Sequence, residues 1–294
     1  MISVIIPYLS GLKELKDCIS SINKQGVNEI IVVNDSEEHL DLLGVKIIDN
    51  KKTKGAAYSR NVGFQNASNE LVLFVDHDII IDDNSITKLK NKIKNVDIVF
   101  PKVIYENNKL MHPVGREKTF PQISACFMVK KSSVKKMDCL FDENYHIYLE
   151  DADFFLRANL FNLKIAYVPD AVVVHKLKHS TNEKRFFLEN KNLLYGIIKF
   201  SNINKQNILH PFHFSSYFSN FICALFNFDK FDWSHYNRDL NSLKKFKLLF
   251  KKHRKITNRN RFILLGQFIK ATFWVLFHQN KPLQAKKRLQ RYLQ

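Results

Sequence analysis

The sequence lacks the features that mark secreted, zinc-binding or membrane-spanning proteins. Its four cysteines (Cys18, Cys126, Cys139 and Cys223) are scattered and form no Cys-x-x-Cys pair, which is typical of reduced cytosolic thiols and disfavours disulfides or a zinc site. No uncharged apolar run reaches about 18 residues, so no simple membrane span is expected. The chain begins without a basic segment followed by a long apolar one, so no secretory signal is expected either.

Acidic residues are scarce in only one part of the chain. Residues 1–179 carry 24 lysines and arginines against 23 aspartates and glutamates, whereas residues 180–294 carry 22 against 5. The net charge of +18 therefore belongs almost entirely to the second part, which also holds 16 of the 25 phenylalanines. We expect two physically different domains with a boundary near residue 180, and a uniformly basic nucleic-acid-binding protein is disfavoured.

Apolar segments of strand length alternate with helical patterns through the first part. Predicted strands cover residues 2–6, 29–33, 45–48, 71–75, 97–104, 124–129, 164–168 and 171–174, and predicted helices cover 11–24, 55–67 and 151–162. Because the strands are apolar throughout, both faces of the sheet should be covered. We therefore predict an α/β fold with a Rossmann-like, mostly parallel sheet and helices on both faces, followed by a helical, basic domain.

Polar side chains follow several of the predicted strands, namely Asp35, Asp76, Asp78 and His175. Ligands of an open parallel α/β sheet bind beyond the carboxyl ends of its strands. Asp76 and Asp78 would point the same way in an extended chain, which suits Mg²⁺ or Mn²⁺, although a solvated acidic turn is the simpler alternative. His175 is either a packed, hydrogen-bonded residue or a further metal ligand.

Other polar residues lie near the starts of two predicted helices. Glu150 and Asp151 either stabilise a helix N-terminus through its dipole or place a general base at the mouth of a cleft. Asp153 and Arg157 have the spacing of an ion pair on that helix. Arg60 is either an ordinary surface residue or faces a phosphate or a base near a helix N-terminus.

Taken in order, these segments resemble glycosyltransferase family 2, the inverting enzymes with the GT-A fold, over about residues 1–180. The segments that carry the resemblance are Ser3-Val-Ile-Ile-Pro7, Ile31-Val-Val-Asn34-Asp35-Ser36, Gly55-Ala-Ala-Tyr-Ser-Arg60-Asn61-Val-Gly63, Phe74-Val-Asp76-His-Asp78, Phe141-Asp-Glu-Asn-Tyr145, Glu150-Asp151-Ala-Asp153 with Arg157, and Tyr167-Val-Pro-Asp-Ala171 with His175. Asn34 stands where the family's second segment has Asp. The last two segments are most similar to bacterial rhamnosyltransferase-type members that build surface polysaccharides.

The resemblance implies a set of residues that bind a nucleotide-diphosphate sugar. This set is Pro7, Asp35, Gly55, Arg60 and Asp76. Pro7 and Asp35 would line the base, with Asp35 accepting a base N–H, and Arg60 would lie beside the base and ribose. Asp76 would contact the ribose or the metal.

The resemblance also implies a metal site and a general base. Asp76, Asp78 and His175 would ligate Mn²⁺ or Mg²⁺, and Asp151 would take the proton of the attacking hydroxyl. The acceptor would be a lipid-linked or cell-envelope glycan. No Gln-x-x-Arg-Trp motif of processive members occurs, so non-processive transfer is expected. Two alternatives stay open: a nucleotidyltransferase of similar fold, and a non-catalytic module that binds nucleotide sugars or an anionic surface.

The second part of the chain has no catalytic motif. Its segments are an aromatic stretch (212–228), a cluster of seven basic residues (244–255), an apolar stretch (262–277) and a second basic stretch (281–291). Apolar segments flanked by basic clusters predict association with an anionic membrane surface. We therefore expect residues 1–180 to form the catalytic domain and residues 181–294 to hold it, as a cytoplasmic protein, peripherally on the cytoplasmic face of the membrane. The alternative is packing against the first domain or a second copy in a homo-oligomer, and nucleic acid is not an expected partner.

Overall fold

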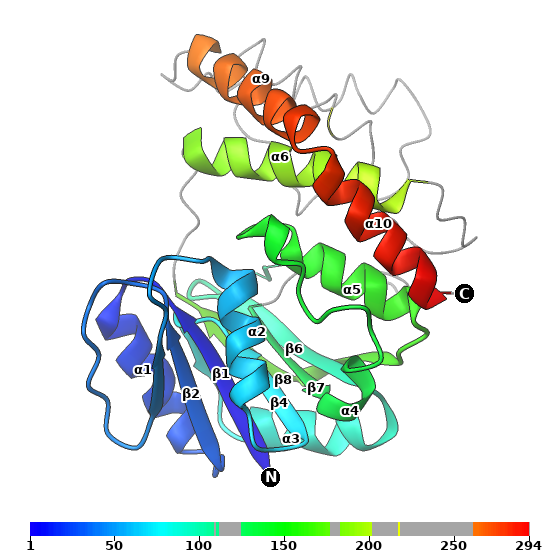
Figure 1. Ribbon diagram of the computed structural model, residues 1–294. Coiled ribbons are helices and arrows are strands. Elements are labelled where there is room, and N and C mark those ends of the chain that lie inside the picture. Colours follow the sequence, from blue (N-terminus) through cyan, green and yellow to red (C-terminus); the bar gives the residue numbers. More distant parts are fainter. Residues whose placement is uncertain (109, 112–124, 177–182, 202–216, 218–260, 294) are drawn as a thin grey trace. The chain divides into compact units, whose positions relative to one another are not determined.

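The computed structural model describes residues 1–108, 110–111, 125–176, 183–201, 217 and 261–293 (Figure 1). The chain divides into two compact units, the first formed mainly by Met1–Lys178 and the second by most of the described residues that follow. The first unit contains a sheet with helices, whereas the described elements of the second unit are all helices.

The first unit is built on one sheet of eight strands. The strands are β1 (Ile2–Tyr8), β2 (Glu29–Asn34), β3 (Lys46–Asp49), β4 (Leu71–Val75), β5 (Ile79–Ile81), β6 (Ile98–Tyr105), β7 (Cys126–Lys130) and β8 (Ile165–His175), in the order β3-β2-β1-β4-β7-β6-β8-β5. Neighbouring strands are parallel from β3 to β4 and between β6 and β8. In contrast, β7 is antiparallel to both of its neighbours, and β5 is antiparallel to β8.

Helices cover both faces of this sheet, and the predicted α/β fold is confirmed. They are α1 (Leu12–Asn23), α2 (Ala56–Asn66), α3 (Ser85–Lys92), α4 (Lys131–Val134) and α5 (Glu150–Leu160), with short 3-10 helices η1 (Ile93–Asn95) and η2 (Glu143–Tyr145). Side chains of α1 and α3 belong to one apolar cluster, and those of α2, α4 and α5 belong to another. In β1, Val4 and Ile6 belong to the first cluster and Ile5 to the second, which explains why the strand is apolar throughout.

The second apolar cluster is rich in phenylalanine. Phe74 of β4 stacks on Phe127 of β7 with ring centroids 4.8 Å apart, and Phe141 stacks on Phe154 of α5 at 5.1 Å. Phe127 also contacts Phe154 at 5.3 Å. Because interiors are close-packed, this chain of rings sets the position of α5 relative to the end of β4.

Some details of the sheet differ from the sequence predictions. Residues 164–168 and 171–174 belong to one strand, β8, whose register against β6 shifts between Pro101 and Lys102. The polar residues that interrupt the apolar pattern form an irregularity within a continuous strand, as β-bulges do. The three-residue β5 is too short to show a period of two. The direction of β7 could not be predicted, because the side-chain pattern of a strand is the same in either direction.

The second unit contains helices α6 (Glu183–Phe200), α9 (Arg261–Phe277) and α10 (Asn280–Leu293). Helix α6 packs against α9 (Figure 1). The Lys191 ammonium of α6 lies 4.7 Å from the centre of the Trp274 ring of α9, and Lys270 of α9 lies 5.5 Å from that of Phe187 of α6. The prediction that the C-terminal region is helical is confirmed.

The sequence features expected to bind a membrane are only partly described. Apart from Tyr217, the aromatic stretch 212–228 lies outside the described residues, as does the basic cluster 244–255. Within the part of the chain that the structure describes, every helix is too short or too polar to span a bilayer.

Candidate active site

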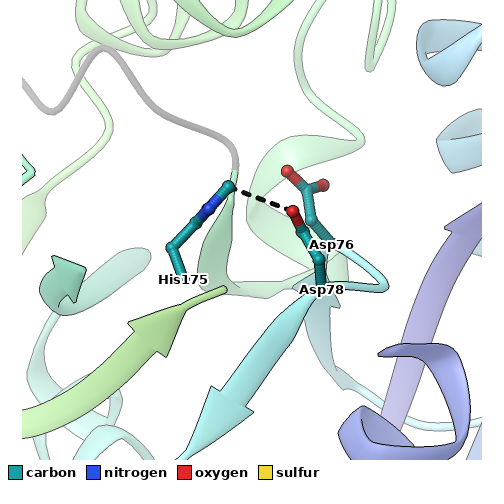
Figure 2. Close-up of side chains that lie close together, drawn as sticks. All are labelled: Asp76, Asp78 and His175. Atoms are coloured by element: carbon teal, nitrogen blue, oxygen red, sulfur yellow. Dashed lines mark ion pairs between the residues drawn. The ribbon is translucent and has the colours of Figure 1, made fainter. Parts of the chain in front are cut away.

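Asp76, Asp78 and His175 come together where two strands end (Figure 2). One ligand atom from each of the three lies within 4.8 Å of the others, and His175 Nε2 is 3.6 Å from Asp78 Oδ2. The local fold explains this meeting. The chain leaves β4 at Val75, turns through the two aspartates and enters β5, where Ile79 pairs with His175 at the end of β8.

The donor set of this cluster fits a divalent cation. Two carboxylates and an imidazole are common ligands of Mn²⁺, and Mg²⁺ favours the oxygens. Asp78 and His175 are buried, whereas the side chain of Asp76 is 30% exposed. Burial raises the pKa of Asp78; His175 opposes this shift, and Asp76 adds to it. A buried carboxylate beside a second one is stabilised by a cation, so the residues present suit the predicted metal.

Arg60 of α2 joins this cluster to the start of α5. Its Nη2 donates to Asp76 Oδ1 and its Nη1 donates to Glu150 Oε1, each at 2.8 Å. The guanidinium is buried and lies over the Phe141 ring, 5.5 Å from its centre. Burial by itself would lower the pKa of Arg60, but the two carboxylates outweigh it and raise that pKa. Sequence spacing did not reveal this bridge.

Asp35 holds the loop that leads into α2. Its Oδ1 accepts from Asn50 Nδ2 at 2.8 Å and from the Lys54 amide at 2.7 Å, and its Oδ2 accepts from the Gly55 amide at 2.7 Å. A carboxylate oxygen can accept two hydrogen bonds, so Oδ2 keeps capacity for one more. Base recognition by Asp35 therefore stays a prediction that the geometry permits.

Gly55 allows a close approach that other residues would prevent. Its φ is +92°, and a Cβ at this position would lie only 2.4 Å from Nδ1 of His146. The His146 carbonyl also accepts a hydrogen bond from the Ala57 amide at 3.2 Å. Gly55 thus allows the start of α2 to pack against the loop before α5. Its predicted contact with the nucleotide sugar stays a prediction.

Pro7 lies near Asp35 at the carboxyl ends of β1 and β2. It pairs with Val33 in the parallel ladder, and the Asp35 amide donates to the carbonyl of Tyr8 at 2.7 Å. The two residues predicted to line a base therefore lie at adjacent strand ends.

Glu150 and Asp151 have different environments at the start of α5. Glu150 is buried against Arg60, whereas Asp151 is only partly buried and its Oδ1 accepts from the Ala152 amide at 2.8 Å. Leu149, which precedes them, has a φ of +63°. Two neighbouring carboxylates with such different surroundings are suited to different roles. Asp151 is the member of the pair that a substrate could reach.

The predicted ion pair on α5 is confirmed. Arg157 Nε donates to Asp153 Oδ2 at 2.6 Å, and both side chains are fully buried. The same guanidinium also binds Asp138 and donates from Nη2 to the Leu140 carbonyl at 2.7 Å. Arg157 therefore fixes the segment that leads into Phe141.

Asn61 makes a contact that the sequence did not predict. Its Nδ2 donates to the Phe141 carbonyl and its Oδ1 accepts from the Phe141 amide, both at 3.0 Å. Asn61 follows Arg60 directly, so the pair Arg-Asn was the available signal. Arg60 binds the carboxylates of Asp76 and Glu150, and Asn61 binds the backbone of Phe141, whose ring lies against the Arg60 guanidinium.

Comparison with known proteins identifies the family of this chain. A family model described as Glycosyl transferase family 2 matches residues 3–158. The chain is 27% identical over 199 residues to the uncharacterized glycosyltransferase YwdF of Bacillus subtilis (strain 168), covering 59% of this chain and 73% of the relative. It is 32% identical over 113 residues to glycosyltransferase GlyG of Streptococcus pneumoniae serotype 4, covering 34% and 38%. It is 30% identical over 112 residues to an N-acetylglucosaminyltransferase of Bradyrhizobium elkanii, covering 33% and 62%.

Two solved structures have the same fold. The crystal structure of S. aureus TarS 1-349 matches with a TM-score of 0.53 and 18% identity, covering 97% of this chain and 88% of that one. The structure of GalNAc-T7 with UDP, GalNAc and Mn²⁺ matches with a TM-score of 0.52 and 15% identity, covering 69% and 52%. At these identities the likeness shows the fold, which is GT-A.

Proposed function

This chain belongs to glycosyl transferase family 2 and is a glycosyltransferase, and we propose that it is an inverting, metal-dependent and non-processive one. Its donor is a nucleotide-diphosphate sugar. The observation that carries the proposal is the cluster of Asp76, Asp78 and His175, whose ligand atoms lie within 4.8 Å of one another. Membership of the family favours a glycosyltransferase over the two alternatives considered above, a nucleotidyltransferase and a non-catalytic module.

The residues divide the chemistry between them. Asp78 and His175, with Asp76, would hold Mn²⁺ or Mg²⁺, which when bound neutralises the charge of the leaving diphosphate. Asp151 takes the proton of the acceptor hydroxyl as that hydroxyl attacks the anomeric carbon from the face opposite the leaving group. A single displacement of this kind inverts the anomeric configuration, by the geometry that governs inverting hydrolysis.

The nucleotide is bound at the carboxyl ends of β1 and β2. Pro7 and Asp35 line the base, Asp35 accepts a base N–H through Oδ2, and Gly55 and Asp76 lie toward the ribose and diphosphate. The buried Arg60, whose terminal nitrogens are bonded to Asp76 and Glu150, acts on this site through Asp76. The free acceptor capacity of Asp35 Oδ2 supports this assignment. The GalNAc-T7 structure of the same fold contains UDP and Mn²⁺, which favours these two as first probes.

A donor screen tests the proposed activity. UDP-, dTDP- and GDP-sugars are incubated with the protein, with and without Mn²⁺, and both binding and slow hydrolysis are scored. We expect one nucleotide class to bind in a Mn²⁺-dependent manner, and the product anomer, read by NMR, to be opposite to that of the donor. Absence of binding by all three classes, or a retained anomer, would contradict the proposal.

We further propose that residues 181–294 hold the catalytic domain, residues 1–180, on the cytoplasmic face of a membrane, where a lipid-linked or cell-envelope glycan is the acceptor. Ile269, Phe273 and Phe277 of α9 are exposed at spacings that place them on one helix face, with exposed fractions of 45%, 53% and 81%. Exposed Lys287 and Arg288 follow on α10. Apolar side chains beside basic ones suit the boundary of an anionic bilayer.

Co-sedimentation with liposomes tests this second role. The full chain should sediment with vesicles that contain anionic lipid and remain in solution with neutral ones, and added salt should release it. The variant F273S/F277S should bind more weakly than wild type, whereas N280S, an uncharged change at an exposed position of α10, is the control. Equal absence of binding to both kinds of vesicle would instead favour packing against a partner or a second copy.

A further inference from the structure

We infer that Arg60 is a positioning residue that links the candidate cation site to the candidate base. Its two terminal nitrogens donate to Asp76 and to Glu150, and Glu150 directly precedes Asp151. The place of the guanidinium therefore sets where α5 begins relative to the cluster. The inference rests on the proposed function, because it gives Arg60 a part in the same transfer.

The link is short and shielded from water. The side chains of Arg60 and Glu150 are 3% and 6% exposed, and both hydrogen bonds are 2.8 Å long. Charge-assisted bonds of this kind are about twice as strong as neutral ones, and solvent screens them little when they are buried. Phe141 supports the guanidinium from one side, and Asn61 holds Phe141 through both of its backbone groups. Small shifts of Asp76 are therefore transmitted to the start of α5.

The bonding of this pair is incomplete within the protein. Among the described residues, Arg60 Nε and Glu150 Oε2 are buried and have no hydrogen-bond partner. A buried polar atom without a partner costs about 1–3 kcal/mol, and native structures keep few of them. A pair that served stability alone would be expected to close these bonds. These two atoms are therefore open to a partner from outside the described residues, such as water or a bound ligand.

Asp76 is shared between the guanidinium and the cluster. A cation bound by Asp76 and the guanidinium of Arg60 compete for the same carboxylate charge, while Glu150 holds the guanidinium from the other side. If Glu150 lost its charge, Asp76 would be the only carboxylate bonded to the Arg60 guanidinium. The guanidinium would then compete more strongly with a cation for Asp76, and the cation would bind more weakly. Because linkage is reciprocal, occupation of the cluster must also alter the Arg60–Glu150 pair, and hence the start of α5.

The variant Glu150→Gln tests the link without any sugar transfer. Glutamine keeps the shape and one acceptor oxygen but loses the charge. Calorimetry with Mn²⁺ and UDP should show Mn²⁺ affinity at least about 5-fold weaker than in wild type, the lower end of common coupling factors. The control is Glu143→Gln, the same change in a nearby residue that contacts Asn61 and not Arg60. Its affinity should stay within about 2-fold of wild type, which excludes a general effect of charge.

The variant Arg60→Lys is an independent test of the positioning role of Arg60. It also tests this role if Glu150→Gln does not fold. Lysine keeps the charge but cannot donate from two fixed nitrogens. Once a donor is identified, kcat should fall at least about 10-fold while the donor KM stays within about 3-fold, because the interaction is used in the transition state. A raised KM with unchanged kcat would assign Arg60 to nucleotide recognition and overturn the inference.

Two outcomes separate this inference from the proposal on which it rests. If wild type binds no Mn²⁺ with any nucleotide, the proposed function fails and the inference fails with it. If wild type binds Mn²⁺ and UDP while folded Glu150→Gln binds them equally well, only the role of Arg60 is refuted.

Discussion

Replacement of Asp151 by asparagine should slow sugar transfer strongly and leave the fold and the donor site intact. Asp151 is partly exposed in the first turn of α5, and asparagine keeps the oxygen that accepts from the Ala152 amide. The change removes one acidic group near a helix N-terminus, which is worth about 0.3–1 kcal/mol. For a unit of this size the melting temperature should therefore fall by no more than about 4 °C.

The kinetic loss should be far larger than this loss of stability. A positioned general base contributes about 10²–10⁴-fold, which corresponds to roughly 2.7–5.4 kcal/mol in the barrier. We expect Asp151→Asn to transfer sugar at least about 10²-fold more slowly, with Mn²⁺ and nucleotide affinities unchanged.

The assay compares release of the nucleoside diphosphate, calorimetric binding of Mn²⁺ and UDP, and melting temperature in one set of samples. Asp83→Asn, the same substitution at an exposed position before α3, serves as the control and should behave as wild type. Transfer by Asp151→Asn at close to the wild-type rate would refute the assignment of the base. A large drop in melting temperature would instead point to a structural role.

Three further variants test contacts within the first unit, the proposed catalytic domain. Asp78→Ala should weaken Mn²⁺-dependent nucleotide binding, and an unchanged thermal shift with nucleotide and Mn²⁺ would argue against the cluster as the cation site. Gly55→Ala should lower the free energy of unfolding by about 1–3 kcal/mol or more, because the new Cβ would collide with His146 at a φ of +92°; urea unfolding would reveal a wild-type midpoint if this were wrong. Asp153→Asn should lower the free energy of unfolding by about 3–5 kcal/mol, since it leaves the buried Arg157 without its closest carboxylate. An unaffected melting temperature would show that Asp138 alone is enough to pair with Arg157.

The sequence predicted those parts of the site that depend on local pattern. The aspartates after β4 follow an apolar run that could be recognised as a strand, and the Asp153–Arg157 pair follows from helical spacing alone. Both features concern residues within a few positions of each other. The α/β class and the helices on both faces also follow from alternation of local patterns.

Contacts between distant segments could not be predicted in this way. Arg60 and Glu150 are separated by 90 positions, and their ion pair depends on the packing of α2 and α5. The meeting of Asp78 with His175 depends on a three-residue strand whose pairing with β8 no periodicity reveals. Glu150 illustrates the limit, because its neighbour Asp151 carries the same charge and only burial distinguishes the two.

The small edge strand β5 has a consequence for how the protein is made. Among the described strands it pairs with β8 alone, and β8 is the last strand of the sheet to leave the ribosome. A nascent chain that ends before β8 carries both aspartates but no complete cluster. A ligand that needs all three groups therefore binds only a first unit that includes β8. At about a hundred times its Kd, the ligand stabilises that unit by about 2.7 kcal/mol. Occupation of the cluster would thus distinguish a nascent chain with a complete, folded sheet from one that ends before β8.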